Sequence, residues 1–475
     1  MKNNFKIFLI LGIICLIYLF TRIYNLTSLP VFGDEAIYVR WSQIIKSVDT
    51  LRFIPLTDGK EPLFMWLTAL NLKFFTPLIA GRLISVFAGL GTIIVLYLLT
   101  SSYLPSLIYI FLPFVFFFDR LALADNLLSF FGLLSLYLTL KLAKYPRWDL
   151  SMILGVVLGL AWLTKSPAIY FLVLALVTFI FVKPANIKKI YFPLLSVLIA
   201  FIIYNILRLG PQFSQIAIRN QDYVWPLSEI LKHPLDPLVP HIKDVIHLYS
   251  YFISLPILLS PLLFFIFRKK IKFNQYFLIY FAWWILPLIA NAAMAKVFTA
   301  RYILFTIPPL ILLFSYFLKP LFSKKYFLIL LLLFIPNIWR IYQICFYPQN
   351  LKLTSTETGY VFGWTSGWGI KPDADYLISR SKVANVIVGT EGAFGTLPDG
   401  LQIYTNNVPR LTVFGVGINI TQIPAKLIDA YNHGDEVYLL FNSSRLKLSS
   451  IEMSKLTLIK NTPKPDGDSL VLYRL

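Results

Sequence analysis

A cluster of charged residues lies between the first two hydrophobic segments of the chain. Its acidic members begin with Asp34 and Glu35, and its basic members include Lys60 and Arg82. A carboxylate in a semi-enclosed cleft can act as a general base on a hydroxyl group. Fixed cations in a site of low dielectric constant stabilise a phosphate leaving group. These residue types together favour transfer of a group from a phospholipid-like donor.

Structural roles compete with this interpretation. Asp34 is a good N-cap, and acidic residues suit the positive end of a helix. Capping explains one carboxylate, however, and not the pair Asp34 and Glu35. Lys60 and Glu61 could belong to a solvated turn that begins at Asp58. The functional alternative is that Lys60 meets an anionic headgroup, most commonly a phosphate, at the bilayer surface.

Further charged residues lie at the predicted outer ends of hydrophobic segments. Snorkelling beside interfacial aromatic residues is the alternative role for each cation alone. Together they place positive charge around the acidic loop. We expect Asp119 to form an ion pair with its neighbour Arg120. The set comprises Arg82, Arg120, Lys165 and Arg301, with Asp119 and Asp125 on either side of Arg120.

The composition is that of a polytopic membrane protein. Of the 475 residues, 57% are hydrophobic and 14% are charged, whereas soluble proteins have ~45–50% and ~25%. The net charge of +20 comes from basic residues between hydrophobic segments, so we expect membrane lipids rather than nucleic acid as partners. Cys15 and Cys345 are far apart and indicate no disulfide framework.

The hydrophobic runs predict about 11 transmembrane helices. Each run approaches the ~20 residues that a bilayer requires. The N-terminal run lacks a small-residue cleavage site, so we expect a retained helix rather than a signal peptide. The other runs cover about 80–100, 103–118, 122–142, 150–164, 167–182, 190–208, 245–267, 274–294, 301–318 and 326–343.

Basic residues fall in five of the six loops predicted to be cytoplasmic, the exception being 101–102, as the positive-inside rule favours. They lie in loops 1–6, 143–149, 183–189, 268–273 and 319–325. This pattern predicts a plasma-membrane protein with a cytoplasmic N-terminus. A first loop at 22–79, a second at about 209–244 and everything after about 344 then lie outside the cytoplasm.

The outer segments have structure of their own. Apolar residues at Ile37, Trp41, Ile44 and Val48 predict an amphipathic helix on the membrane surface. Pro62 can start a second short helix at 63–75. Alternating runs after residue 350 predict strands near 383–389, 411–416, 437–442, 456–459 and 470–473, with a helix at 424–431. We therefore expect a membrane domain at 1–345 and a small extracytoplasmic α/β domain at 346–475.

Several motifs carry a resemblance to a known family. The chain resembles the GT-C fold glycosyltransferases that use polyprenyl-phosphate sugars, and in particular the protein O-mannosyltransferases and the lipid A aminoarabinose transferases. The resemblance covers roughly residues 5–345. The matching motifs are Asp34-Glu35-Ala36-Ile37-Tyr38, Lys60-Glu61-Pro62-Leu63, Gly81-Arg82-Leu83, Arg120 to Asp125, Gly159 to Pro167, and Arg301-Tyr302-Ile303-Leu304 with Pro308-Pro309.

This resemblance implies an inverting transfer of a hexosyl or pentosyl group from a polyprenyl phosphate to an acceptor hydroxyl or phosphate outside the cytoplasm. Asp34 would be the general base, and Glu35 would support the site or the acceptor. The remaining roles follow from the motifs: donor phosphate binding by Lys60, Arg82, Lys165 and Arg301, and contacts to the acceptor or to these residues by Glu61, Tyr38, Arg120 and Asp125.

The chain departs from the family pattern at two positions. The family commonly has Pro-Pro after the basic residue of the second motif, where this chain has Glu61-Pro62. Ser166 stands where the related motif usually has Gly. No metal site is predicted, although Asp34, Glu35 and Glu61 could together hold a divalent cation. Lys60 and Arg82 argue instead that fixed cations suffice.

Two other classes of function stay open at this stage. A flippase or transporter of lipid-linked sugars would favour charges at the membrane midplane and inverted repeats, and the sequence has no visible repeat. A membrane scaffold with a glycan-binding outer domain would tolerate the change Asp34→Asn. The acceptor, whether lipid, glycan or protein, is not specified by these motifs.

Overall fold

The computed structural model describes residues 2–182, 184–323 and 325–475. These residues form two compact units, each assembled from three segments of the chain. The helical unit comprises Met1–Leu26, Thr50–Leu67 and Arg82–Gln343, and the mixed unit comprises Thr27–Asp49, Thr68–Gly81 and Ile344–Leu475. The first outer loop, 22–79, therefore contributes residues to both units.

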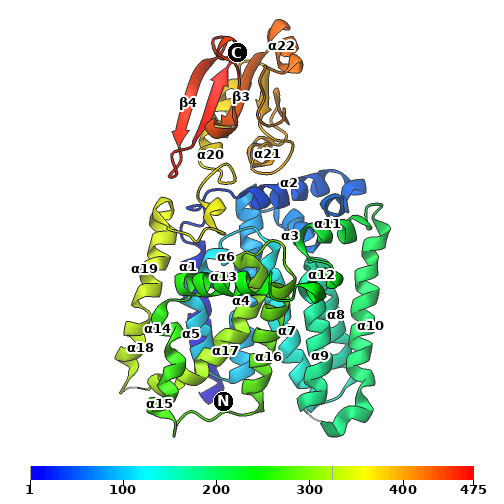
Figure 1. Ribbon diagram of the computed structural model, residues 1–475, viewed down its shortest axis with the longest axis vertical. Helices are drawn as coiled ribbons and strands as arrows, with labels where there is room; N and C mark the ends of the chain where they lie inside the picture. The colour runs from blue at the N-terminus through cyan, green and yellow to red at the C-terminus, as the bar shows by residue number, and fades with distance from the viewer. Residues whose placement is uncertain (1, 183, 324) are drawn as a thin grey trace. The chain divides into compact units, whose positions relative to one another are not determined.

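Helices dominate the helical unit (Figure 1), and many of them are apolar. Among the described residues, six helices are long and apolar enough to cross a membrane, and the bent pair α18 (Phe327–Leu333) and α19 (Ile335–Phe346) adds a seventh if it counts as one span. Two shorter apolar helices, Trp148–Thr164 and Ser166–Val182, accompany them. The predicted class, a polytopic helical membrane protein with a small C-terminal sheet domain, is confirmed.

The helices that match predicted runs have the following bounds: α1 (Lys2–Ile23), α4 (Pro77–Thr100), α5 (Leu104–Ile110), α6 (Pro113–Asp119), α7 (Ala124–Lys144), α8 (Trp148–Thr164), α9 (Ile169–Val182), α10 (Tyr191–Tyr204), α13 (Leu238–Phe252), α14 (Leu255–Leu258), α15 (Leu263–Phe267), α16 (Gln275–Met294), α17 (Ile307–Leu318), α18 (Phe327–Leu333) and α19 (Ile335–Phe346).

Three of the predicted runs are broken rather than continuous, and the run 326–343 divides into the bent pair α18 and α19. The run 103–118 divides into α5 and α6, and Pro113 is the first residue of α6. The run 245–267 is interrupted at Ser254, which has a φ of 73°, and Pro256 follows in the first turn of α14. Proline lacks an amide hydrogen for the preceding turn, so helices restart at these positions.

Helices α7, α8, α9 and α10 pack against one another (Figure 1). Their ends position two charged residues. Asp125 lies in the first turn of α7. Lys165 follows the last residue of α8 in an extended conformation, with φ −167° and ψ 144°, before the short 3-10 helix η3 (Ser166–Ala168). This break in the helix turns Lys165 and Ser166 out of the regular helical register.

The mixed unit contains a five-stranded sheet with the order β2-β1-β3-β5-β4. Strand β1 is parallel to β2 and β3, and β5 is antiparallel to β3 and β4. All five predicted strands are confirmed. Their bounds are β1 (Val386–Thr390), β2 (Leu411–Gly415), β3 (Glu436–Asn442), β4 (Thr457–Pro463) and β5 (Ser469–Arg474).

Helices cover both faces of this sheet. Leu427 of α22 (Ala425–Asn432) packs with Val437, Leu439 and Phe441, which alternate along β3. The opposite face is contacted by α20 (Ile370–Ser381), whose Tyr376 ring lies 6.1 Å from the Tyr438 ring. Alternate residues of a strand point to opposite faces, so one strand supplies the core on both sides.

The two predicted helices of the first outer loop are confirmed as α2 (Gly33–Ser47) and α3 (Leu63–Asn71). Helix α2 packs along α21 (Asp399–Thr405) within the mixed unit. The second outer loop forms α11 (Gln215–Tyr223) and α12 (Leu227–Lys232) and leads into α13. Helix α11 contacts the short 3-10 helix η2 (Ile54–Asp58) within the helical unit.

Candidate active site

A tight turn presents Lys60 and Glu61 between η2 and α3. The amide of Lys60 donates to the carbonyl of Pro55 at 3.0 Å. Gly59 has a φ of 65°, and a Cβ atom there would lie 2.6 Å from the Cβ of Arg219. Only glycine satisfies both the left-handed conformation and this close approach.

Lys60 belongs to a small network of alternating charges. Its ammonium group pairs with Asp58, and Arg219 of α11 donates to the same carboxylate at 2.8 Å. Arg219 also pairs with Asp222 at 2.7 Å. The Lys60 side chain is 18% exposed and that of Arg219 is 38% exposed. Solvent, and therefore a ligand, can reach these cations.

Glu61 is the buried carboxylate of the same turn. The hydroxyl of Ser166 donates to Glu61 Oε1 at 2.5 Å, and Asn220 Nδ2 donates to the Ser166 oxygen at 3.3 Å. Burial raises the pKa of Glu61 to about 7, although Ser166, Lys165 and Lys60 all act to lower it. Glu61 and Ser166 are the two departures from the family pattern, and they contact each other.

Lys165 and Asp125 form an ion pair at 2.6 Å, and their side chains are 22% and 2% exposed. The Lys165 ammonium lies 4.6 Å from the centre of the Tyr302 ring, and the guanidinium of Arg301 lies 5.1 Å from the same ring. The carbonyl of Tyr302 accepts from Asn291 at 3.2 Å. The structure thus brings Lys165, Asp125 and Arg301 together around one aromatic side chain.

Two other predicted site residues contact main-chain oxygens. Arg82 is fully buried and donates to the carbonyl of Leu26 at 2.8 Å. Arg120, also fully buried, donates to the carbonyls of Arg22 and Tyr24 at 2.9 and 2.8 Å, close to the end of α1. The last carbonyls of a helix lack intrahelical donors. The guanidinium of Arg120 provides hydrogen-bond donors for carbonyls at this end of α1.

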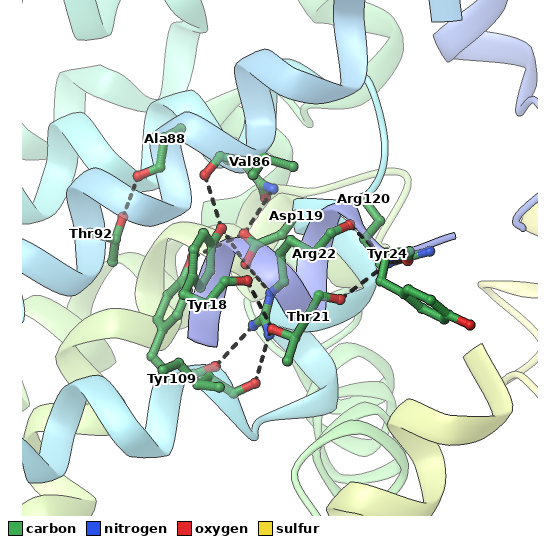
Figure 2. A network of polar contacts seen from close by, with 12 residues as sticks. Tyr18, Thr21, Arg22, Tyr24, Val86, Ala88, Thr92, Tyr109, Asp119 and Arg120 are labelled. Carbon is green, nitrogen blue, oxygen red and sulfur yellow. Dashed lines mark hydrogen bonds and ion pairs between the residues drawn. The ribbon is translucent and has the colours of Figure 1, made fainter. Parts of the chain in front are cut away.

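The predicted ion pair between Asp119 and Arg120 is wrong. Asp119 instead forms its ion pair with Arg22, at 3.2 Å. Figure 2 shows this fully buried network, in which Tyr18 and Tyr109 each donate a hydroxyl to Asp119 at 3.0 Å. A Cβ atom on Gly89 would lie 2.0 Å from the Tyr18 hydroxyl. The sequence could not reveal this network, because its members are up to 101 positions apart.

In the mixed unit, Asp34, Glu35 and Tyr38 lie on the first turns of α2. Glu35 is fully buried, and its Oε2 accepts from the amide of Phe32 at 3.1 Å. Glu35 therefore makes the helix-end contact that we considered for Asp34. Asp34 is half-buried, and Tyr38 follows it by four positions on the same side of the helix.

Residues from the C-terminal part of the chain hold the start of α2. The Phe32 ring lies 4.3 Å from the Tyr360 ring, and Phe32 pairs with Ser366 as an isolated β-bridge. The amide of Gly33 donates to the carbonyl of Thr365 at 3.1 Å. The orientation of Asp34 thus depends on a segment more than 300 residues away in sequence.

The polar residues Asp58, Asn220, Asn291 and Tyr302 were absent from the predicted site. Tyr302 belonged to a matching motif, and Asp58 precedes the turn of Lys60, so both carried a sequence signal. Asn220 and Asn291 carried none. Among the residues that the structure describes, no group of three or more His, Cys, Asp or Glu side chains is arranged to hold a metal ion.

The apolar helices and the C-terminal sheet define a multi-pass helical membrane protein with a small mixed domain. Residues 59–207 match the family model described as dolichyl-phosphate-mannose-protein mannosyltransferase. This range contains Lys60, Glu61, Asp125, Lys165 and Ser166. The resemblance based on the sequence motifs is confirmed by this match.

Solved structures of one other protein share the fold over nearly the whole chain. ArnT from Cupriavidus metallidurans bound to undecaprenyl phosphate is similar with a TM-score of 0.61 and 14% identity, over 98% of this chain and 97% of that chain. The apo state of ArnT is similar with a TM-score of 0.59 and 14% identity, over 99% and 98%. No curated protein sequence matches the chain significantly. Together the matches show a fold shared with ArnT and a segment similar to the mannosyltransferase family.

Proposed function

We propose that the protein transfers a sugar from a polyprenyl phosphate to an acceptor hydroxyl or phosphate at the outer face of the plasma membrane, with inversion at the anomeric carbon. One observation carries the proposal: the hydrogen bond between Ser166 and Glu61 joins the segments that carry the partly exposed Lys60 and Lys165, inside the region that matches the mannosyltransferase family. Two partly exposed cations on joined segments suit an anionic donor headgroup.

The proposed reaction assigns one proton transfer and one displacement. Asp34 accepts the proton of the acceptor hydroxyl, whose oxygen then bonds to the anomeric carbon. The bond from that carbon to the phosphate oxygen breaks on the opposite face, and polyprenyl phosphate leaves with the electron pair. Lys60, Lys165 and Arg301 stabilise the negative charge that develops on the phosphate.

The other predicted residues position this machinery. Glu35 fixes the start of α2 and hence Asp34, and Tyr38 lies one turn further along the helix. Asp125 orients Lys165 through its ion pair. Arg82 and Arg120 act through the main-chain oxygens near the end of α1.

The variant Asp34→Asn tests the proposal. Because a general base contributes ~10²- to 10⁴-fold, we expect turnover to fall by roughly that factor while donor affinity stays within about twofold. The assay follows release of polyprenyl phosphate from a panel of polyprenyl-phosphate sugars, with purified protein in nanodiscs and an envelope extract as the acceptor source.

Asp49→Asn is the matched control, because Asp49 is an exposed aspartate at the other end of α2. We expect it to retain full turnover. The proposal fails if Asp34→Asn keeps turnover within a few-fold of the wild type. Movement of intact lipid-linked sugar across the bilayer by both proteins would instead favour a flippase.

A further inference from the structure

A second candidate binding site lies within the mixed unit. A cavity of about 850 Å³ is bordered by residues 27–31 before α2, by the last turns of α2, by segment 72–79, and by C-terminal segments 367–372 and 403–407. Ligand pockets typically enclose ~300–1,000 Å³. None of the residues proposed for sugar transfer lines this cavity, so it constitutes a separate site.

The charged side chains that line the cavity are basic. Lys46 and Lys371 line it, and none of the described lining residues is acidic. The Lys46 ammonium donates to the carbonyl of Leu72 at 3.1 Å, which holds it between the end of α2 and segment 72–79. Lys371 pairs with Asp375, and both side chains are more than half exposed. Such exposed pairs contribute little, so Lys371 can exchange this partner for a bound anion at small cost.

Aromatic and amide side chains accompany the two lysines. Trp368 and Tyr404 line the cavity and are half-buried, so part of each ring is accessible. The Trp368 Nε1 donates to the carbonyl of Val361 at 2.8 Å, which fixes the ring. An apolar ring face suits the C–H face of a sugar. The amides of Asn406 and Asn407 also line the cavity, and amides can bond to sugar hydroxyls.

The cavity wall is held in place before any ligand arrives. Arg40 of α2 donates to Asn406 Oδ1 at 2.7 Å and to Gln402 Oε1 at 3.1 Å. Gln43 of α2 donates to the carbonyl of Ile403 at 2.9 Å. These bonds join α2 to the region of α21, and a pre-formed wall reduces the entropic cost of binding.

One wall of the cavity includes the first residues of a candidate membrane span. Residues 75–79 line it, and α4, which begins at Pro77, is one of the helices long and apolar enough to cross a bilayer. The end of such a helix lies at the level of lipid headgroups. We propose that this cavity binds an anionic saccharide, namely a sugar that carries a phosphate or a carboxylate.

Direct binding to the full-length protein tests the inference without any transfer reaction. We expect glucose 1-phosphate and glucuronate to bind in calorimetric titrations, and glucose and inorganic phosphate to bind at least tenfold more weakly. The double variant Lys46→Glu, Lys371→Glu should lower the affinity for both anionic sugars at least tenfold. Lys382→Glu, an exposed lysine of the same unit outside the cavity, should leave it unchanged.

Two further arms separate the sources of the ligand and exclude misfolding. Nanodiscs that contain a glycolipid with a phosphorylated sugar headgroup should compete with glucose 1-phosphate if the ligand is membrane-anchored, whereas absence of competition assigns the site to soluble sugars. The single variant Lys46→Arg keeps the positive charge and should therefore bind both anionic sugars like the wild type. The inference is overturned if glucose binds as tightly as glucose 1-phosphate, or if the double variant binds like the wild type. Loss of binding in Lys382→Glu would overturn it as well.

Discussion

Two clusters of charged residues in the helical unit differ in a way that separates architecture from chemistry. In the first, Arg22 and Asp119 are fully buried, and the hydroxyls of Tyr18 and Tyr109 complete the shell around the carboxylate (Figure 2). In the second, Lys60 and Lys165 keep about a fifth of their side chains exposed. Charged groups that are buried and fully hydrogen-bonded by the protein indicate a structural role. Charged groups that stay partly exposed leave room for a ligand.

The comparison also explains why residue type alone is a poor guide to function. Arg82 and Arg120 resemble Lys165 in the sequence, because all three lie at helix ends. In the structure Arg82 and Arg120 are fully buried against carbonyls, whereas Lys165 pairs with Asp125 and faces the Tyr302 ring. An interaction with main-chain oxygens fixes the chain, whereas the partly exposed ammonium of Lys165 can rearrange around a substrate.

The largest expected effect is on the buried cluster. Arg22→Met leaves the Asp119 carboxylate buried without its cation, which typically costs ~3–5 kcal/mol. We expect a large fall in melting temperature in detergent. Arg147→Met breaks the exposed pair with Asp149, whose side chains are 67% and 52% exposed, and should leave the melting temperature unchanged. Equal melting temperatures for Arg22→Met and wild type would erase the distinction between the clusters.

A smaller effect, on binding rather than stability, is expected at the exposed cluster. Lys60→Ala leaves Asp58 with its second partner, Arg219, so the fold should be retained. Loss of a charge-assisted contact worth ~1.5–3 kcal/mol should weaken donor binding roughly 10- to 100-fold. Lys232→Ala, which removes an exposed lysine in α12, is the control. An unchanged donor affinity in Lys60→Ala would argue against its phosphate-binding role.

The smallest expected effect is a pH dependence of donor affinity that arises from the titration of Glu61. Glu61 has a pKa of about 7 in the folded protein, raised by burial from 4.5. A raised carboxyl pKa means that the folded state binds the proton more tightly, so this contribution to stability is present below pH 4.5 and is lost as the pH rises through about 7. Above that pH the ionised Glu61 also places negative charge beside Lys60 and Lys165.

Donor affinity of the wild type should therefore fall roughly two- to fivefold between pH 6 and pH 8. The variant Glu61→Gln, which cannot ionise, should show a flat profile. The donor phosphate is a diester without a second ionisation near neutral pH, so it does not account for the change. A parallel slope in wild type and Glu61→Gln would show that Glu61 is not the titrating group.

Much of the fold follows from local sequence pattern. The alternating runs located all five strands, and the spacing of Ile37, Trp41 and Ile44 predicted α2. These features depend on neighbouring residues, so short-range periodicity is sufficient. The interruptions at Pro113 and Ser254 were missed, because hydropathy does not register a missing amide hydrogen or a left-handed backbone.

The candidate site likewise has features that local sequence predicts and features that it does not. The sequence by itself determined which residue types are available: an acidic pair at the start of α2, a Lys-Glu turn, and cations at the ends of apolar helices. Only the tertiary structure decided their partners. It joined Glu61 to Ser166 across 105 positions, gave Asp119 to Arg22 rather than to its neighbour, and assigned the helix-end contact of α2 to Glu35. Each of these outcomes depends on burial and on contacts between distant segments, which no local pattern encodes.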